Sequence, residues 1–461
     1  MSFHAVVIGG GVDALVAAHL LARRGKQVLV VEERAPAAQD FGWVPSQVVR
    51  ELGLELKIDA PDPWATALLQ DGGKLELWRD VRRTSASIRR FSERDAQRWP
   101  DFCRRMAALA RLFEQLYLET PAAPLNLRFA LRVRGLGREG MVDLMRLLPM
   151  PVAELLEDWF ECDALKGALG AMGILNLQQG PRSGGTAFRF LHHHVGSPEG
   201  VFRPPRTNLS SVLRARAGVD LQPGKITKIL VKAGRAVGVV RDDGEEIVAP
   251  TVISGADPRR TLLELADPAW LDPELARAIQ HIRRRGVAAR IAFDSSLQTN
   301  IVFAPSLDHL ERAYDEVKYG RVSREPYLEA YSSPQGFEVH FQYVPQDMKD
   351  DIAATVRRCL PGLENAKVGS ILGPVDLERE EGWPEGQPYH GCIRPRVVKR
   401  LVFLSAALVA GCETKPDLAL GEKLYAQHCA SCRPRCALRP SRRRMAQRPR
   451  GRSGRPSARC R

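Results

Sequence analysis

The strongest constraint on the fold lies in residues 4–32. An apolar run ends at Ile8, a turn reads Gly9-Gly10-Gly11-Val12-Asp13-Ala14, and a second apolar run over residues 28–31 ends at Glu32. Glycines that follow a strand, open a helix and precede an acid about twenty residues on are typical of a dinucleotide-binding βαβ unit. The chain is therefore predicted to begin with a Rossmann-like α/β domain.

Each position of this loop has a physical role. Gly9 permits a tight turn, and Gly11 has no side chain to hold a pyrophosphate away from the backbone, with Gly10 between them. Ala14 still allows close packing of helix against strand. Glu32 can accept hydrogen bonds from ribose hydroxyls, and its charge disfavours a 2′-phosphate, so FAD or NAD is expected rather than NADP. The alternative is the same fold with a glycine turn and no nucleotide.

The stretch after the loop, residues 15–25, resembles the phytoene-dehydrogenase-like FAD oxidoreductases. Three later segments agree with this resemblance: residues 91–96, 191–196 and 252–261. Within the family the similarity is greatest to the group of pyridine nucleotide-disulfide oxidoreductase domain-containing protein 2, and it covers residues 1 to about 390. A motif placed almost at residue 1 also favours FAD over NAD as the cofactor.

The resemblance implies further contacts with FAD. A β-meander is expected over residues 226–231, 236–241 and 247–252, with a turn at Asp243-Gly244. By carry-over from the family, the backbone of Ile226 would face the adenine and Gly255-Ala256 would lie near the cofactor. The predicted cofactor-binding residues are Gly9, Gly10, Gly11, Ala14, Glu32, Glu33, Ile226, Gly255 and Ala256.

Three family features are altered. The double glycine expected after Glu32 is missing from residues 34–45, and Pro204-Pro205-Arg206-Thr207-Asn208 replaces a Pro-x-Gly-Gly element. The match ends near residues 373–380, before a C-terminal FAD-contacting segment would begin. These departures leave open a second hypothesis, a flavoprotein-like remnant or scaffold without stable FAD.

The expected fold class is α/β: an FAD/NAD(P)-binding Rossmann-like domain with a β-meander, an α+β substrate domain and a disordered C-terminal tail. The expected boundaries are 1–75 and 197–265 for the FAD-binding domain, 76–196 and 266–393 for the substrate domain, 394–432 for a lipoprotein-signal and cytochrome c-like fragment, and 433–461 for the Arg/Pro-rich tail.

Local patterns predict several elements. Ser92 and Asp95 are spaced as a capping box before a long helical face, and Ser46 is a candidate N-cap after a turn at residues 42–45. Short strands are expected at residues 75–78 and near Val81, and helices over 125–180. His192-His193-His194 is expected in a loop or strand edge near a substrate cavity, because consecutive residues do not share one face and make a poor metal site. No metal is predicted.

The net charge of +14 belongs to the end of the chain. Residues 433–461 contain twelve arginines and no acid, and residues 1–393 carry a net charge of −1. A near-neutral body gives no reason to expect binding to nucleic acid. The arginine-rich tail itself leaves a basic nucleic-acid-binding arm as one interpretation.

Residues 394–432 change in character. A basic stretch at 396–400, an apolar run at 401–408 and Val409-Ala410-Gly411-Cys412 resemble a bacterial lipoprotein signal. Residues 421–432 resemble the start of a class I cytochrome c, but Arg433 stands where the axial histidine of C-x-x-C-H belongs. The favoured interpretation is that the body runs into a neighbouring lipoprotein cytochrome and then loses frame. A membrane-attached cytochrome fusion is the alternative.

The cysteines of the body, Cys103, Cys162, Cys359 and Cys392, are scattered and suggest a reducing compartment. No C-x-x-x-x-C follows the glycine loop, so no redox-active disulfide is expected. With no signal peptide at the start, a cytoplasmic location is predicted. The apolar run at 401–408 is too short to span a bilayer.

The leading hypothesis is an FAD-dependent oxidoreductase. The resemblance implies hydride transfer from an apolar or conjugated substrate to the flavin. No residue qualifies as a catalytic acid or base from sequence.

Overall fold

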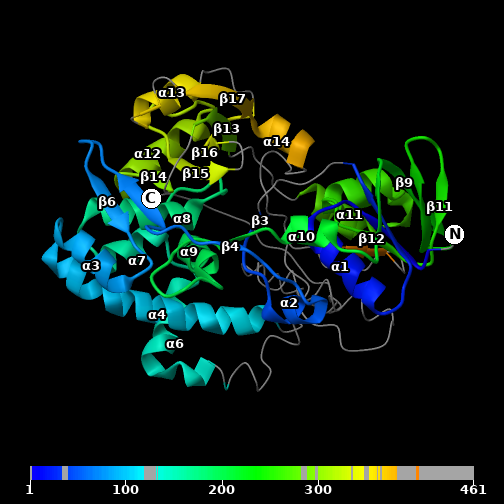
Figure 1. The fold of residues 1–461 in the computed structure, drawn as a ribbon, viewed down its shortest axis with the longest axis horizontal. Coiled ribbons are helices and arrows are strands. Elements are labelled where there is room, and N and C mark those ends of the chain that lie inside the picture. The colour runs from blue at the N-terminus through cyan, green and yellow to red at the C-terminus, as the bar shows by residue number, and fades with distance from the viewer. Residues whose placement is uncertain are drawn as a thin grey trace, which may run out of the picture.

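The computed structural model describes residues 3–33, 40–118, 131, 133–281, 288–295, 300–333, 336–346, 352–360, 362–363, 366–381 and 401–403. Figure 1 shows the elements around α1 and β12 on one side of the molecule and α3 to α9 on the other. The predicted α/β class is confirmed by the parallel sheet below.

A five-stranded sheet in the order β18-β12-β1-β2-β8 forms the N-terminal domain. All its pairs are parallel. The central strands have continuous apolar sequence because both faces are covered, as in most parallel sheets. The bounds are β1 Ala5–Ile8, α1 Val12–Arg23, β2 Val28–Glu32, α10 Leu209–Ala215, β8 Asp220–Pro223, β12 Val252–Ser254 and β18 Leu401–Phe403.

Strand β18 occupies an unexpected place. The sequence assigned Leu401–Phe403 to a signal-like segment apart from the body, but these residues pair with Val252–Ser254 of β12. An apolar run of this kind is typical of strands in parallel sheets. The other predicted features of residues 394–461 lie outside the described residues.

The predicted β-meander is present as β9 Ile226–Lys232, β10 Arg235–Arg241 and β11 Glu246–Val248. The turn before β11 contains Gly244 at a φ of 87°, a conformation that favours glycine. The chain then passes through η1 Arg260–Leu265, η2 Pro268–Trp270 and α11 Pro273–Gln280. Helix α11 packs through Leu275 and Ile279 on the apolar residues of the parallel sheet and the meander, so this packing extends beyond the expected boundary at 265.

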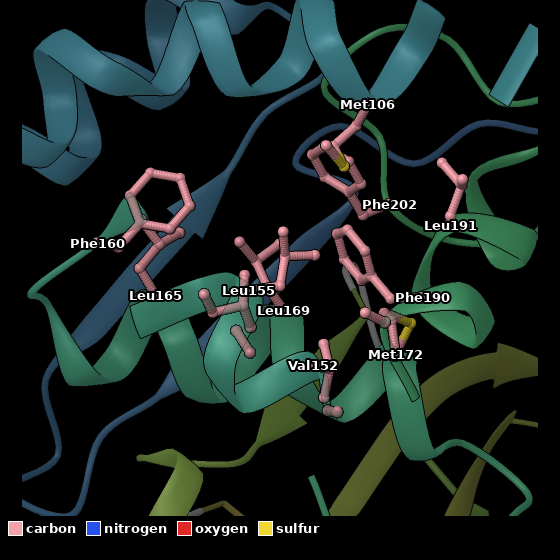
Figure 2. Packing of buried hydrophobic residues seen from close by; sticks show 14 of the residues in the cluster. Met106, Val152, Leu155, Phe160, Leu165, Leu169, Met172, Phe190, Leu191 and Phe202 are labelled. Atoms are coloured by element: carbon pink, nitrogen blue, oxygen red, sulfur yellow. The ribbon is translucent and has the colours of Figure 1, made fainter. Parts of the chain in front are cut away.

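A helical layer forms the largest hydrophobic core. Its elements are α3 Val81–Arg89, α4 Glu93–Tyr117, α6 Gly137–Leu147, α7 Val152–Trp159, α8 Asp163–Ile174 and α9 Thr186–His194. Figure 2 shows Phe190 and Phe202 packed face to face in this core, with ring centroids 5.0 Å apart. Helices α6, α7 and α8 thus lie within residues 125–180, where helices were predicted.

The Ser92–Asp95 capping box is half confirmed. The Ser92 side chain accepts a hydrogen bond from the Asp95 backbone N–H. The Asp95 carboxylate does not accept the reciprocal hydrogen bond from the Ser92 backbone N–H; it accepts hydrogen bonds from the backbone N–H groups of Glu161 and Cys162 instead. A side chain at this position therefore ties α4 to the start of α8.

A seven-stranded sheet, in the order β17-β13-β16-β15-β14-β5-β6, lies against these helices. Its strands are β5 Ala65–Leu68, β6 Lys74–Leu77, β13 Ala288–Asp294, β14 Ile301–Phe303, β15 Leu328–Ser333, β16 Gly336–Gln342 and β17 Lys367–Leu372, with α12 Leu307–Lys318, α13 Ile352–Cys359 and α14 Pro374–Glu381. Because β5 pairs with β14, this sheet begins before the expected boundary at residue 76.

Two local predictions were wrong. Residues near Val81 start helix α3 rather than a strand, because the Asp80 carboxylate accepts hydrogen bonds from the N–H groups of Arg82 and Arg83. In helix α2, Ser46–Leu52, the N-cap position is Pro45 rather than Ser46, and no side chain caps the helix. A small sheet in the order β3-β7-β4, from Asp40–Phe41, Arg206–Thr207 and Ile58–Asp59, completes the fold.

Candidate functional site

The glycine loop forms the expected turn at the carboxyl end of β1. Gly9 has a φ of 95°, and its N–H donates to the Val31 carbonyl at 2.8 Å. Gly11 is the N-cap of α1, and no side chain caps the helix. An uncapped helix N-terminus presents backbone N–H groups and the positive end of the helix dipole, which attract phosphate. The start of α1 therefore fits a pyrophosphate.

Gly10 has a role that the sequence pattern did not specify. A Cβ at Gly10 would lie 2.0 Å from Oε2 of Glu32 and 2.8 Å from Nη2 of Arg214. The missing side chain leaves room for this carboxylate and guanidinium directly beside the loop. A glycine is therefore needed at position 10 because a side chain would collide with Glu32, and not because the backbone conformation requires it.

Glu32 forms an ion pair that sequence reasoning missed. Arg214 of α10 donates from Nη1 to Oε1 of Glu32 at 2.7 Å and from Nη2 to Oε2, and the same Nη2 lies 3.4 Å from the Gly10 carbonyl oxygen. Each carboxylate oxygen retains acceptor capacity for a ribose hydroxyl. Because Arg214 lies far along the chain from Glu32, no local sequence signal could have predicted the pair.

Gly255 and Ala256 lie beside the glycine loop. The Gly255 N–H donates to the Ile8 carbonyl at 2.8 Å. A Cβ at Gly255 would approach the Ala14 Cβ to 2.9 Å, so the two small residues let α1 pack against the end of β12. The loop and the Gly255-Ala256 turn therefore meet between β1 and β12. The strand that follows β1 lies on one side of this pair and the strand that follows β12 lies on the other, which is the usual nucleotide position in such sheets.

Glu33 and Ile226 lie at the adjacent end of β2. The Glu33 carboxylate pairs with Arg260 at 2.5 Å and with Lys225 at 3.8 Å. The Gly224 N–H donates to the Glu32 carbonyl, which brings the start of β9 and Ile226 to this edge, with the Ile226 side chain buried. The structure thus brings the predicted residues to one edge of the sheet; their roles toward a cofactor stay predictions.

The three consecutive histidines lie in the last turn of α9, not in a loop or strand edge. Nδ1 of His193 bonds the Met172 carbonyl, Nδ1 of His194 bonds the Val201 carbonyl, and Tyr117 bonds His192. Burial lowers the pKa of His192 to about 3 and of His194 to about 4. Within the described ranges no group of side chains is arranged to hold a metal ion. His193 and His194 therefore bond backbone carbonyls, and His192 bonds the side chain of Tyr117.

A second polar site, also missed from the sequence, surrounds a pocket of about 150 Å³. Arg203 pairs with the buried Glu329 at 2.6 Å, and Tyr327 donates to the same carboxylate at 2.8 Å. Arg206 lies 3.4 Å from Asp59 and 4.3 Å above the Tyr331 ring. Burial, and then repulsion from Arg203, lowers the pKa of Arg206.

Comparisons with known proteins agree with the first site. The family described as "NAD(P)-binding Rossmann-like domain" matches residues 7–58. Pyridine nucleotide-disulfide oxidoreductase domain-containing protein 2 of Rattus norvegicus is 26% identical over 85% of this chain and 84% of its own length. Hydroxyneurosporene desaturase of Rubrivivax gelatinosus is 27% identical over 55% of this chain and 53% of its own length. These similarities confirm the resemblance to the FAD oxidoreductases that the sequence motifs indicated.

Among solved structures, an oxidoreductase from Methanosarcina mazei has the same fold, with a TM-score of 0.52 and 13% identity over 92% of this chain and 98% of its own. None of the helices in the described part of the chain is long and apolar enough to cross a membrane.

Proposed function

We propose that this chain is an FAD-dependent oxidoreductase similar to the phytoene-dehydrogenase-like enzymes, and that it removes a hydride from an apolar or conjugated substrate. The observation that carries the proposal is the joint position of the uncapped α1 N-terminus and the Glu32 carboxylate at one edge of the sheet. The sequence similarity to an oxidoreductase domain-containing protein and to a desaturase supports an oxidoreductase reaction.

In this proposal the N–H groups at the start of α1 hold the pyrophosphate, and Gly11 lets it approach the backbone. Glu32, oriented by Arg214, accepts hydrogen bonds from the ribose hydroxyls. Bound FAD would accept the hydride from the substrate carbon. No acid or base is assigned, and the protein's part is to orient the reactants and exclude water.

A titration of purified chain with FAD, ADP and FMN tests this function. In this proposal the residues at the sheet edge contact the ADP half of FAD. FAD should therefore bind and ADP should compete with it, while FMN, which lacks the ADP half, should bind far more weakly. The Glu32→Ala variant should weaken FAD and ADP together by about tenfold, the value of one or two hydrogen bonds to a charged group. Equal affinity for FMN and FAD would refute the assignment.

The second candidate function, a remnant or scaffold without stable FAD, is favoured by one observation. Arg206 and Thr207 stand where the resemblance implies a glycine pair, and both are buried. A folded chain that binds neither FAD nor ADP would support this candidate. The cytoplasmic location and the lack of a nucleic-acid partner stay predictions of the sequence.

A further inference from the structure

The pocket of about 150 Å³ combines apolar walls with an excess of positive charge. Ile58, Pro61, Trp64 and Val201 contribute apolar surface. Three arginines also line it, Arg79, Arg203 and Arg206, against the single acid Asp59 among its described lining residues. Even when Glu329, the partner of Arg203, is included, one positive charge is left over.

Two buried donors at this pocket have no acceptor. Nη1 of Arg203 and Nε1 of Trp64 make no hydrogen bond among the described residues, although the two side chains are almost completely buried. A buried donor without a partner costs about 1–3 kcal/mol, more when the group is charged. Both residues line the pocket, so a ligand with anionic oxygens bound there would bring acceptors to their side of it and balance the charge.

The size of the pocket limits the ligand. A cavity of about 150 Å³ accommodates a benzene ring. A dinucleotide is too large for it, whereas a carboxylate attached to a ring or a short branched chain matches both the apolar walls and the arginines.

We propose that this pocket binds the carboxylate of a small apolar organic acid, and that such an acid is the substrate of this chain. The substrate assignment rests on the proposed oxidoreductase function; the binding of a carboxylate in the pocket does not. Arg203 and Trp64 would donate to the carboxylate, Arg79 and Arg206 would supply attraction, and the apolar walls would hold the organic group.

Calorimetric titration of the full chain with benzoate tests the proposal, with benzamide as the neutral probe of the same shape and inorganic phosphate as the anion without an apolar group. Benzoate should bind at least about tenfold more tightly than either, the value of one hydrogen bond to a charged group. Equal binding of benzamide, or tighter binding of phosphate, would overturn the proposal.

Matched variants locate the site. Trp64→Phe should weaken benzoate about tenfold, whereas Trp99→Phe, which also removes a buried and unpartnered Nε1–H but does not line the pocket, should leave affinity unchanged. Arg79→Gln should weaken binding several-fold while the exposed Arg82→Gln does not. The double variant R203Q/E329Q removes the buried ion pair as a unit and should abolish the preference for benzoate over benzamide.

Repeating the benzoate titration in the presence of FAD distinguishes carboxylate binding from the substrate assignment. If saturating FAD abolishes benzoate binding, the pocket belongs to the cofactor and the substrate assignment is refuted. If the chain binds benzoate but no FAD, the proposed oxidoreductase function fails while the anion site stands. Unchanged benzoate affinity in both Trp64→Phe and Arg79→Gln would refute the site itself.

Discussion

At the scale of single residues, the neighbouring glycines Gly10 and Gly11 are required for different reasons. Gly10 leaves room for the Glu32–Arg214 pair, whereas a Cβ at Gly11 would meet only Asp13 Oδ1 at 3.2 Å. Gly11 also has an ordinary extended backbone, with a φ of −64°. The fold therefore does not require a glycine here, as expected if the proposed pyrophosphate contact is the reason for it.

Substitution separates these roles. Gly11→Ala should change the free energy of unfolding by less than about 0.5 kcal/mol but lower FAD affinity at least about tenfold, because the methyl group would occupy the space of the pyrophosphate. Gly10→Ala should destabilise the apo protein by about 1–2 kcal/mol through the displaced ion pair. Denaturant titrations and FAD titrations measure both; a Gly11→Ala variant with wild-type FAD affinity would contradict the loop assignment.

The buried His194 predicts a pH dependence of stability. Its folded pKa of about 4 lies below the unfolded value of about 6.5, so the unfolded chain binds the proton first as the pH falls. Stability should be unaffected above pH 6.5 and should fall by about 2 kcal/mol between pH 6.5 and 5 from this group. The His194→Phe variant should lose that part of the pH dependence in denaturant unfolding, and the exposed His281→Phe control should keep it.

At the scale of elements, one side chain fastens the long helix α4 to its neighbour. Asp95 is completely buried and accepts a bifurcated hydrogen bond from the Glu161 N–H, 3.0 Å to each carboxylate oxygen, and another from the Cys162 N–H at 2.7 Å. Removing it leaves these N–H groups without an acceptor. The sequence pattern identified the cap but not this longer-range partner, because the helical period says nothing about residues 66 positions away.

Asp95→Ala should therefore lower the free energy of unfolding by about 3 kcal/mol. Asp101→Ala, in the same helix, removes a partly exposed carboxylate that pairs with Arg104 and Arg105, and should cost less than about 1 kcal/mol. Equal effects of the two substitutions in urea unfolding would show that the buried contacts of Asp95 do not stabilise the domain.

Strand β18 makes the second prediction at this scale. A chain ended after residue 393 lacks β18 and leaves the edge of β12 unpaired, so it should unfold at a lower temperature and aggregate more readily. A chain ended after residue 432 keeps β18 and should match the full-length protein. Identical thermal midpoints for all three chains would show that Leu401–Phe403 add nothing to the sheet.

At the scale of the whole molecule, the elements that could be predicted from the sequence are those that local sequence patterns determine. The strand-loop-helix-strand unit, the meander and the capped start of α4 follow from periodicity, glycine positions and caps, and all are present. Contacts between distant segments were missed: Glu32 with Arg214, Arg203 with Glu329, and β18 with β12. Such pairs depend on how the elements pack, and a single sequence gives no measure of that packing.

Flavin content tests the central claim most directly. The chain is exposed to excess FAD, purified and freed of unbound cofactor. It should then absorb light at about 450 nm, a property of the bound flavin. Denaturation should release close to one FAD, not FMN, per chain. A well-folded, colourless protein that releases no flavin would contradict the account.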